Sequence, residues 1–317
     1  MSFFKGMKAT ALFVAATVAL PGEGTAGEDR LNFGTDFSTY FMTREAPQSQ
    51  PLLSTAFGVP NPGNILNASA ISPGWNPGFG VSVYTQLDDA KQFGIEAGGF
   101  FITPFEDNFS TPIAAVIETS VPVFVGGSAS TTTRWNSQIY GFEANATYQM
   151  QDGLQLFSGL RYISLKETFD VTYQPSAVRV NFDATNNLFG PQIGVRADLD
   201  SLFGREGSGP FNFGGEFATG LLFNAASNSA VGTGGLVPSF SDTDKNSPFV
   251  RASLNVGYEA GPGTDVSFGY NALWIDNVAQ VTDQVGTIGV LGTPSTISRF
   301  SDVLYHGAEF KITIALN

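Results

Sequence analysis

The stretch Val250–Trp274 reads VRASLNVGYEAGPGTDVSFGYNALW and alternates apolar with polar or small residues on both sides of Gly261-Pro262-Gly263. A period of two is the pattern of a β-strand, and two such runs around a tight turn predict an antiparallel hairpin. Each run is long enough for a tilted strand to cross a bilayer, which takes about nine to eleven residues, whereas strands of globular proteins have about five or six. The question is therefore which solvent the apolar face meets.

The N-terminal residues predict export. Two lysines precede an apolar run from Ala9 to Leu20, and Gly24-Thr25-Ala26 supplies the small residues that a signal peptidase reads. A buried or amphipathic helix is the alternative, but the run is too short to span a membrane and the basic start fits export. Residues 1–26 are expected to be a cleaved signal peptide, and the mature chain is expected to begin at Gly27.

Composition narrows the class of protein. No later segment has the roughly 18 consecutive apolar residues of a transmembrane helix, so a membrane-spanning chain would have to be a barrel, whose backbone groups pair within a closed sheet. The chain has 37 Gly, 29 Phe and 9 Tyr, and only 14% of its residues are charged, against about 25% in soluble domains. It has no cysteine, and its net charge of −13 argues against nucleic acid as a partner.

The runs and their connections predict the topology. Short turns near residues 88–91, 151–153 and 261–263 alternate with long connections at 43–78, 103–136, 224–248 and 275–304. This layout is typical of outer-membrane barrels, with short periplasmic turns and longer extracellular loops. The alternating runs cover residues 31–42, 79–87, 93–102, 137–148, 154–173, 179–199, 211–223, 249–259, 264–274 and 305–316.

We therefore expect residues 27–317 to form an all-β, up-and-down antiparallel transmembrane β-barrel of about 10 strands. Twelve strands are the alternative if residues 114–126 pair as a hairpin within a loop or enter the wall. A secreted soluble β-protein is a second alternative, in which the apolar face would be a core. The length of the strands, the uncharged character of the polar face and the aromatic residues near strand ends favour the membrane.

The phase of each strand assigns its two faces. The residues expected to face lipid are Val250, Leu254, Val256, Tyr258, Val266, Phe268, Tyr270, Trp274, Phe310, Ile312 and Ile314. The charged residues expected to face the lumen are Asp36, Glu96, Glu143, Arg161, Arg196, Glu216, Arg251, Asp265 and Lys311.

Hairpin geometry predicts two ion pairs across neighbouring strands, Glu143 with Arg161 and Arg196 with Glu216. Two interpretations of the lumen remain open. The charges line a hydrated path for small solutes, or they fill a barrel of modest width, since about eight strands leave an interior that side chains fill. Inward glycines such as Gly141 and Gly194 favour the first interpretation because they leave space.

Catalytic motifs are missing from the sequence. It contains neither a G-x-S-x-G elbow nor a G-x-x-x-x-G-K-[ST] loop, and His306 is its only histidine. At the start of the last run, beside Tyr305, His306 is better interpreted as a polar interface residue than as a base. We expect no enzyme activity, no metal and no cofactor.

Several segments resemble a known family. Pro51-Leu-Leu-Ser-Thr55, Ile139-Tyr-Gly-Phe-Glu-Ala-Asn145, Gly159-Leu-Arg-Tyr-Ile-Ser-Leu165 and Thr185-Asn-Asn-Leu-Phe-Gly-Pro-Gln-Ile-Gly194 occur in the order found in beta-barrel porin family seven. The part around Phe189-Gly-Pro191 is also similar to pore-forming major outer membrane proteins. The resemblance implies an outer-membrane barrel of porin type.

The expected function follows from the fold and the resemblance. We expect passive diffusion of small hydrophilic solutes through a narrow lumen in the cell outer membrane of a Gram-negative envelope. The alternative is a non-conducting structural or surface-binding barrel whose long extracellular loops contact partners. The expected partners are outer-membrane lipid, the barrel-assembly machinery during insertion and small solutes; whether the chain forms a homo-oligomer is left open.

Overall fold

The computed structural model describes residues 33–55, 64–88, 90–112, 115–117, 130–175, 178–202, 211–233, 238–285, 297 and 299–316. The expected signal peptide, residues 1–26, and the expected mature start at Gly27 lie outside these residues. No helix within the described ranges is long and apolar enough to cross a membrane.

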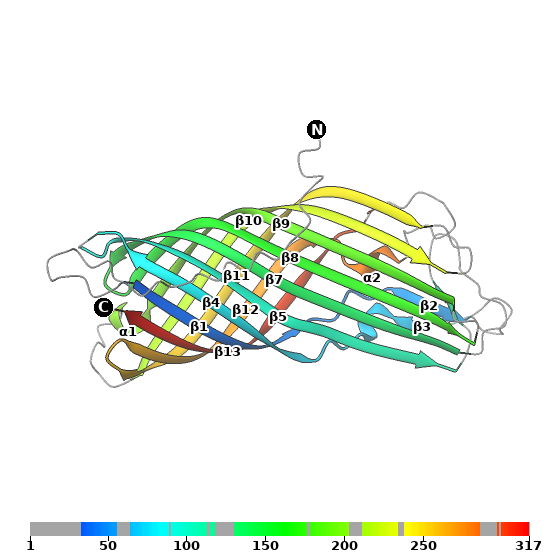
Figure 1. Cartoon of the computed structure of the whole chain (residues 1–317), viewed down its shortest axis with the longest axis horizontal. Coiled ribbons are helices and arrows are strands. Elements are labelled where there is room, and N and C mark those ends of the chain that lie inside the picture. The colour runs from blue at the N-terminus through cyan, green and yellow to red at the C-terminus, as the bar shows by residue number, and fades with distance from the viewer. Residues whose placement is uncertain are drawn as a thin grey trace, which may run out of the picture. The chain divides into compact units, whose positions relative to one another are not determined.

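Ten of the described strands close into one antiparallel barrel (Figure 1), which confirms the predicted fold and strand number. The strands are β1 (Phe33–Arg44), β4 (Trp75–Gln86), β5 (Phe93–Thr111), β7 (Ser130–Gln151), β8 (Leu154–Gln174), β9 (Val178–Asp198), β10 (Phe211–Gly232), β11 (Ser239–Gly261), β12 (Thr264–Val278) and β13 (Ser301–Leu316). The wall closes because β1 pairs with β13 as well as with β4.

The register shows how strongly the strands are staggered. A path through paired residues that starts at Phe33, on β1, and passes through β4, β5 and the later strands reaches Leu304 on β13. Leu304 accepts a hydrogen bond from Glu45, so the path returns to the chain 45 − 33 = 12 residues further on. A shift of this kind requires tilted strands, at about 35–45° to the barrel axis.

Tight turns join the strands at one end, which we call the turn end; the opposite end is the loop end. Gly153 and Gly263 have φ of +75° and +71° in the turns after β7 and β11, a conformation that glycine adopts without steric cost. The short helix α1 (Leu199–Leu202) follows β9 at the same end (Figure 1). The predicted positions of the short connections are confirmed.

The side chains of β8 reverse their polarity halfway along the strand. In the turn half Leu160 points outward and is 49% exposed, while Arg161 points inward and is buried. In the loop half Lys166 and Asp170 lie on the outer face, and Phe169 is buried inside. Alternation alone predicted one apolar outer face for the whole run; the structure confines that face to the turn half.

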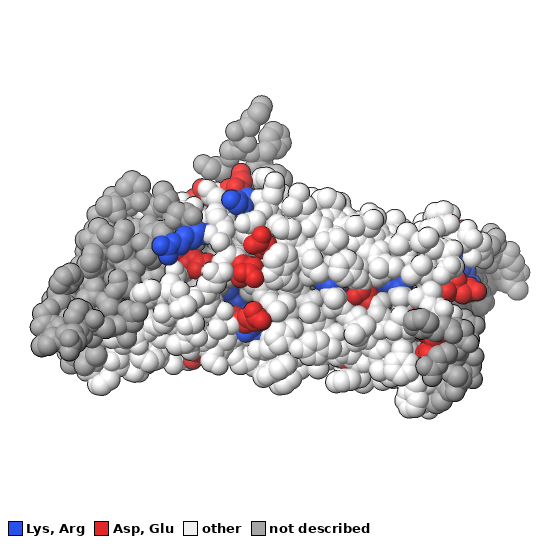
Figure 2. Space-filling model, turned by 180° about the vertical axis from the view of Figure 1, so that it is seen from behind, with Lys and Arg blue, Asp and Glu red and all other residues white. Residues whose placement is uncertain are grey.

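The other long strands repeat this reversal. On β9 the exposed outer residues Phe189 and Ile193 belong to the turn half, whereas Asp183 and Arg179 belong to the loop half. Figure 2 shows the result on one face, where a stretch with few charged atoms separates charged groups nearer the two ends. An apolar outer belt of limited height is what a hydrocarbon layer of about 25–30 Å requires.

Two of the four expected long loops contain long extensions of the wall strands. β5 and β7 occupy much of residues 103–136, and β10 and β11 occupy much of residues 224–248. The sequence was misleading here because the outer face of these extensions is rich in Ser, Thr, Asn and Asp, a composition shared with loops. Six strands, β5 and β7 to β11, therefore continue beyond the apolar belt.

The other two expected loops, 43–78 and 275–304, contain short elements near the loop end (Figure 1). They hold β2 (Pro51–Thr55), β3 (Asn64–Asn67), the 3-10 turn η1 (Ala68–Ala70) and the helix α2 (Val281–Gln284). β2 pairs with β3 and with β6 (Ala115–Ile117) in a separate three-stranded sheet. The described part of residues 114–126 thus adds no strand to the wall, and the twelve-strand alternative is wrong.

We expect the apolar belt to determine which substitutions the barrel tolerates. Leu160→Arg, on the outer face of the turn half of β8, should lower the free energy of unfolding by about 2–4 kcal/mol, the cost of an arginine near the middle of a bilayer. Thr168→Arg, on the outer face of the same strand beyond the belt, should change it by less than about 0.5 kcal/mol. Equilibrium unfolding in phospholipid vesicles measures both, and equal losses would contradict the proposed position of the belt.

Candidate functional site in the barrel lumen

The predicted ion pair between Glu143 and Arg161 is present. The two residues face each other in the register of β7 and β8, and the guanidinium contacts the carboxylate. The Arg161 side chain is only 3% exposed. Its Nε donates to Gln192 Oε1 at 2.7 Å, and Gln192 Nε2 donates to Glu143 Oε2 at 2.9 Å. The pair is thus bonded on several sides, as a buried charge needs to be.

The second predicted pair, Arg196 with Glu216, is also present. The residues are register partners on β9 and β10, and Arg196 Nε lies 2.8 Å from Glu216 Oε2. The same guanidinium donates from Nη2 to Glu96 Oε1 at 2.7 Å. Since β5, which carries Glu96, is not a neighbour of β9 in the wall, this contact crosses the lumen.

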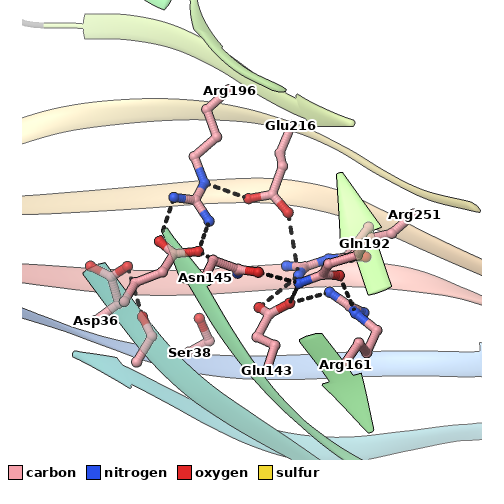
Figure 3. Close-up of polar contacts among 12 residues, drawn as sticks. Asp36, Ser38, Glu143, Asn145, Arg161, Gln192, Arg196, Glu216 and Arg251 are labelled. Carbon is pink, nitrogen blue, oxygen red and sulfur yellow. Dashed lines mark hydrogen bonds and ion pairs between the residues drawn. The ribbon is translucent and has the colours of Figure 1, made fainter. Parts of the chain in front are cut away.

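Arg251 joins the two pairs into one cluster. Its Nη1 lies 3.4 Å from a Glu143 oxygen and 3.3 Å from a Glu216 oxygen. Figure 3 shows these side chains converging from different strands. Three arginines and three glutamates balance in charge. We call this cluster the lumen network: Glu96, Glu143, Arg161, Arg196, Glu216 and Arg251, with the amides of Asn145 and Gln192.

The three other charged residues expected in the lumen lie apart from this network. Asp36 and Lys311 line a cavity beside it. Asp265 is paired in the register with Glu259 near the turn end, and it takes no part in the network.

The expected lipid-facing residues lie on the outer face of β11, β12 and β13. Leu254 is 67% exposed, and the other large exposed members are Val256, Tyr258, Phe268, Tyr270 and Phe310. Val250, Val266, Trp274, Ile312 and Ile314 are partly covered. Contact of this face with lipid remains a proposal.

An apolar layer lies above the network, toward the loop end. The inward residue that follows Arg161 along β8 is Ile163, which is fully buried, and the Arg161 guanidinium lies 5.0 Å from the ring centroid of Phe249. The layer is part of the main hydrophobic cluster and includes Met42, Ile102, Ile139, Ile163, Leu222, Phe249, Leu273 and Tyr305.

A segment folded into the barrel closes the loop half. Asn277–Val285, which we call the inserted segment, contains α2, and the side chains of Val281, Thr282, Asp283 and Gln284 are all buried. Asn186 donates to the carbonyl of Ala279 at 2.9 Å and accepts from its N–H at 2.8 Å. Burial raises the pKa of Asp283, which accepts a hydrogen bond from Ser301.

A buried ion pair between Arg44 and Glu167 fastens the inserted segment. Both side chains are 0% exposed. Arg44 Nη2 donates to Gln280 Oε1 at 2.7 Å, and the N–H of Val281 donates to Glu167 Oε2 at 2.7 Å. Each of the two charged groups thus makes one hydrogen bond to the inserted segment.

Sequence reasoning missed this pair. The sequence predicts a loop at Arg44, although this residue is the last one of β1. Glu167 has the same phase along β8 as Arg161, so the alternation did contain a signal for it. The position of the inserted segment had no comparable signal, because its contacts depend on residues far apart in the chain.

The inward glycines do not leave the space that the sequence suggested. A Cβ added to Gly141 would lie 2.6 Å from the Phe100 ring, and one added to Gly194 would lie 2.2 Å from the Phe157 ring. Rings from the neighbouring strands already cover these positions, a packing that shields glycine in sheets. At these two positions glycine therefore makes room for a ring, not for a wide aqueous path.

One cavity of about 370 Å³ remains on the turn side of the apolar layer. Its lining extends from Thr85, Gln86 and Thr313, near the turn end, to Leu273 and Tyr305 in the apolar layer. The cavity thus ends below the packed loop half.

Metal-ligating side chains are not clustered in the part of the chain described. No three His, Cys, Asp or Glu residues are placed to hold a metal ion there. His306 lies beside Tyr270 and Trp75, with ring centroids 5.9 and 6.2 Å away, in a cluster separate from the lumen network.

Comparison with known proteins supports the fold alone. No family model matches the chain, and no curated protein matches it, so the resemblance to beta-barrel porin family seven is not confirmed. The outer membrane protease OmpT from Escherichia coli is similar in structure, with a TM-score of 0.50 at 10% identity over 92% of this chain and 100% of that one. The chain has the fold of an outer-membrane β-barrel.

Two further solved structures are more distant. The translocator domain of the autotransporter NalP from Neisseria meningitidis has a TM-score of 0.43 at 6% identity, with 90% of this chain and 89% of that one covered. The toluene transporter TbuX from Ralstonia pickettii has 0.32 at 9% identity, with 91% and 89% covered. At these identities none of the three activities extends to this chain.

The lumen network should be sensitive to the loss of one charge. Glu143→Leu should lower the free energy of unfolding by about 3–5 kcal/mol, because Arg161 would stay buried without its carboxylate. The double variant Glu143→Leu/Arg161→Leu should recover most of this loss. Equilibrium unfolding in phospholipid vesicles provides the measurement.

The control for that experiment is the exposed pair Glu106–Arg134, whose side chains are 42% and 54% exposed. Glu106→Leu should cost no more than about 1 kcal/mol. A loss at Glu143 as small as that at Glu106 would show that the lumen network does not stabilise the barrel.

Glycine packing can be tested at Gly141. Gly141→Ala should lower the free energy of unfolding by about 1–3 kcal/mol, because the new methyl group displaces the Phe100 ring. Gly261→Ala is the control, since nothing lies within 4 Å of a Cβ there. Samples are heated to a series of temperatures and run on a gel. The temperature at which the folded band disappears should fall for Gly141→Ala and stay the same for Gly261→Ala.

Proposed function

We propose that this chain is an outer-membrane barrel that carries a β-structure at the cell surface and whose lumen is closed to solute flow. The observation that carries the proposal is the filled loop half. The inserted segment, its Arg44–Glu167 pair and the apolar layer occupy the interior there. A bore that is closed at the loop end leaves the outer surface as the part of the molecule that can meet partners there.

The orientation follows from the connections. Short turns belong on the periplasmic side and longer connections outside the cell. In this orientation the loop halves of β5 and β7 to β11 stand above the outer leaflet, with their polar outer faces in water. Their interior is packed like that of a soluble domain, which supports a rigid display surface.

The display surface carries charges of both signs. Arg134 and Glu106 form an exposed pair at 2.7 Å, and Asp170 lies next to Asn181, which donates to it at 2.8 Å. A surface of mixed charge suits a polar partner. We therefore place partner binding on these extended hairpins, in agreement with the second sequence interpretation.

Porin-like diffusion of small hydrophilic solutes is the second candidate. The cavity of about 370 Å³, with its charged lining, favours it. Passage would require the inserted segment and the apolar layer to move together, because both lie between this cavity and the loop end. The exposed location in the outer membrane and the export signal are common to both candidates.

Planar-bilayer recording separates the two candidates. The folded wild-type protein should show no discrete channel steps, because the lumen network and the apolar layer both obstruct the bore. Replacing residues 279–285 by a Gly-Ser linker should leave it silent, since both obstructions remain. Folding is verified by the different gel mobility of unheated and boiled samples.

Discrete steps from the wild-type protein would overturn the closed-barrel proposal. Steps that occur only after the replacement would identify the inserted segment as the barrier that closes the wild-type bore, and the diffusion candidate would then require this segment to move.

A further inference from the structure

The cavity beside the lumen network has the dimensions of a small binding site. Its volume of about 370 Å³ is near the lower end of the range for ligand pockets, about 300–1,000 Å³. Residues of β1, β4, β5 and β13 line the cavity together with residues of the lumen network. The apolar layer closes one end, so a ligand would enter from the turn end.

The charges around the cavity do not balance. The six charged residues of the lumen network compensate one another. The other charged groups in the lining are Asp36, Glu309 and Lys311, two carboxylates against one ammonium. The cavity therefore has an excess of one negative charge.

Neither carboxylate forms an ion pair within 4 Å among the described residues. Asp36 accepts from Ser82 Oγ at 3.1 Å through one oxygen, while its other oxygen is buried without a hydrogen bond. Glu309 accepts from Ser38 Oγ at 2.8 Å and from Asn271 Nδ2 at 3.3 Å, both neutral donors. Figure 3 shows Asp36 and Ser38 to one side of the network. Confined carboxylates of this kind are stabilised by a cation.

Aromatic rings complete the wall. A Cβ on Gly34 would lie 2.2 Å from the Tyr84 ring, and one on Gly80 would lie 2.9 Å from the Tyr40 ring. Both rings thus rest against glycine backbone and belong to the cavity lining. Ring faces attract organic cations, and their contact is stronger away from water.

We propose that this cavity binds a small organic cation, a molecule with one protonated amine that enters from the turn end. The ammonium would hydrogen-bond to the Asp36 oxygen that lacks a partner, Glu309 would add electrostatic attraction, and the carbon skeleton would lie against Tyr40 and Tyr84. A divalent metal fits less well, because two separated carboxylates and aromatic rings offer few oxygen ligands. The proposal does not depend on whether the bore conducts.

Ethanolammonium chloride is the probe, and ethylene glycol and sodium glycolate are its neutral and anionic counterparts of similar size. Isothermal titration of the full chain in detergent should detect binding of the cation only. Asp36→Asn and Glu309→Gln should each weaken it about tenfold, which corresponds to about 1.4 kcal/mol. Asp152→Asn, an exposed change in the turn after β7, should leave it unchanged.

Lys311→Met provides a test with the opposite sign. It removes the like charge from the cavity and should tighten ethanolammonium binding several-fold, whereas Lys91→Met, in an exposed turn, should have no effect. All variants must retain the gel mobility of the folded barrel. Misfolding would not raise the affinity for ethanolammonium, so it cannot explain the result expected for Lys311→Met.

Three results would overturn the proposal. The first is the absence of ethanolammonium binding to the folded wild-type protein. The second is an ethanolammonium affinity that stays at the wild-type value after Asp36→Asn and after Glu309→Gln. The third is preferential binding of glycolate that Lys311→Met abolishes. The last result would assign the cavity to an anion.

Discussion

Backbone hydrogen bonding in hydrocarbon is the constraint on which the rest of this structure depends. Every N–H and C=O that meets lipid must find a partner within the protein, and a sheet achieves this only by closing on itself. Pairing of β1 with β13 removes the last free edge. Closure with ten strands then fixes a narrow bore. The side chains inside must pack together and compensate one another's charges in this limited space.

Two solutions are found at different heights in the bore. In the turn half, charged side chains meet opposite charges and amides, with Arg161, Glu143 and Gln192 as the most enclosed example. In the loop half the outer face of the wall is polar, and the inward residues include an apolar cluster to which Phe169 and Phe182 belong, with ring centroids 6.3 Å apart. The change in polarity of the outer face and the change of inner chemistry occur along the same strands.

The sequence predicted what depends on local alternation. The strand number, the up-and-down order, the short turns and the ion pairs Glu143–Arg161 and Arg196–Glu216 all follow from a period of two and from hairpin spacing. The loop limits were wrong because Ser- and Thr-rich strands above the belt have the composition of loops. The Arg44–Glu167 pair and the inserted segment depend on contacts between distant residues, which periodicity does not encode. Glycine at an inward position was ambiguous, since the neighbouring ring decides whether space remains.

Arg196 connects β9 to β5, and Arg251 connects β11 to β7. These ion pairs cross the bore between strands that are not neighbours in the wall. A hollow tube flattens easily when it is squeezed from the side, but one with internal cross-bracing keeps a round section. Lateral pressure from the surrounding membrane would therefore act on these guanidinium–carboxylate contacts before it could bend the wall. The contacts make the barrel stiffer than the bilayer around it.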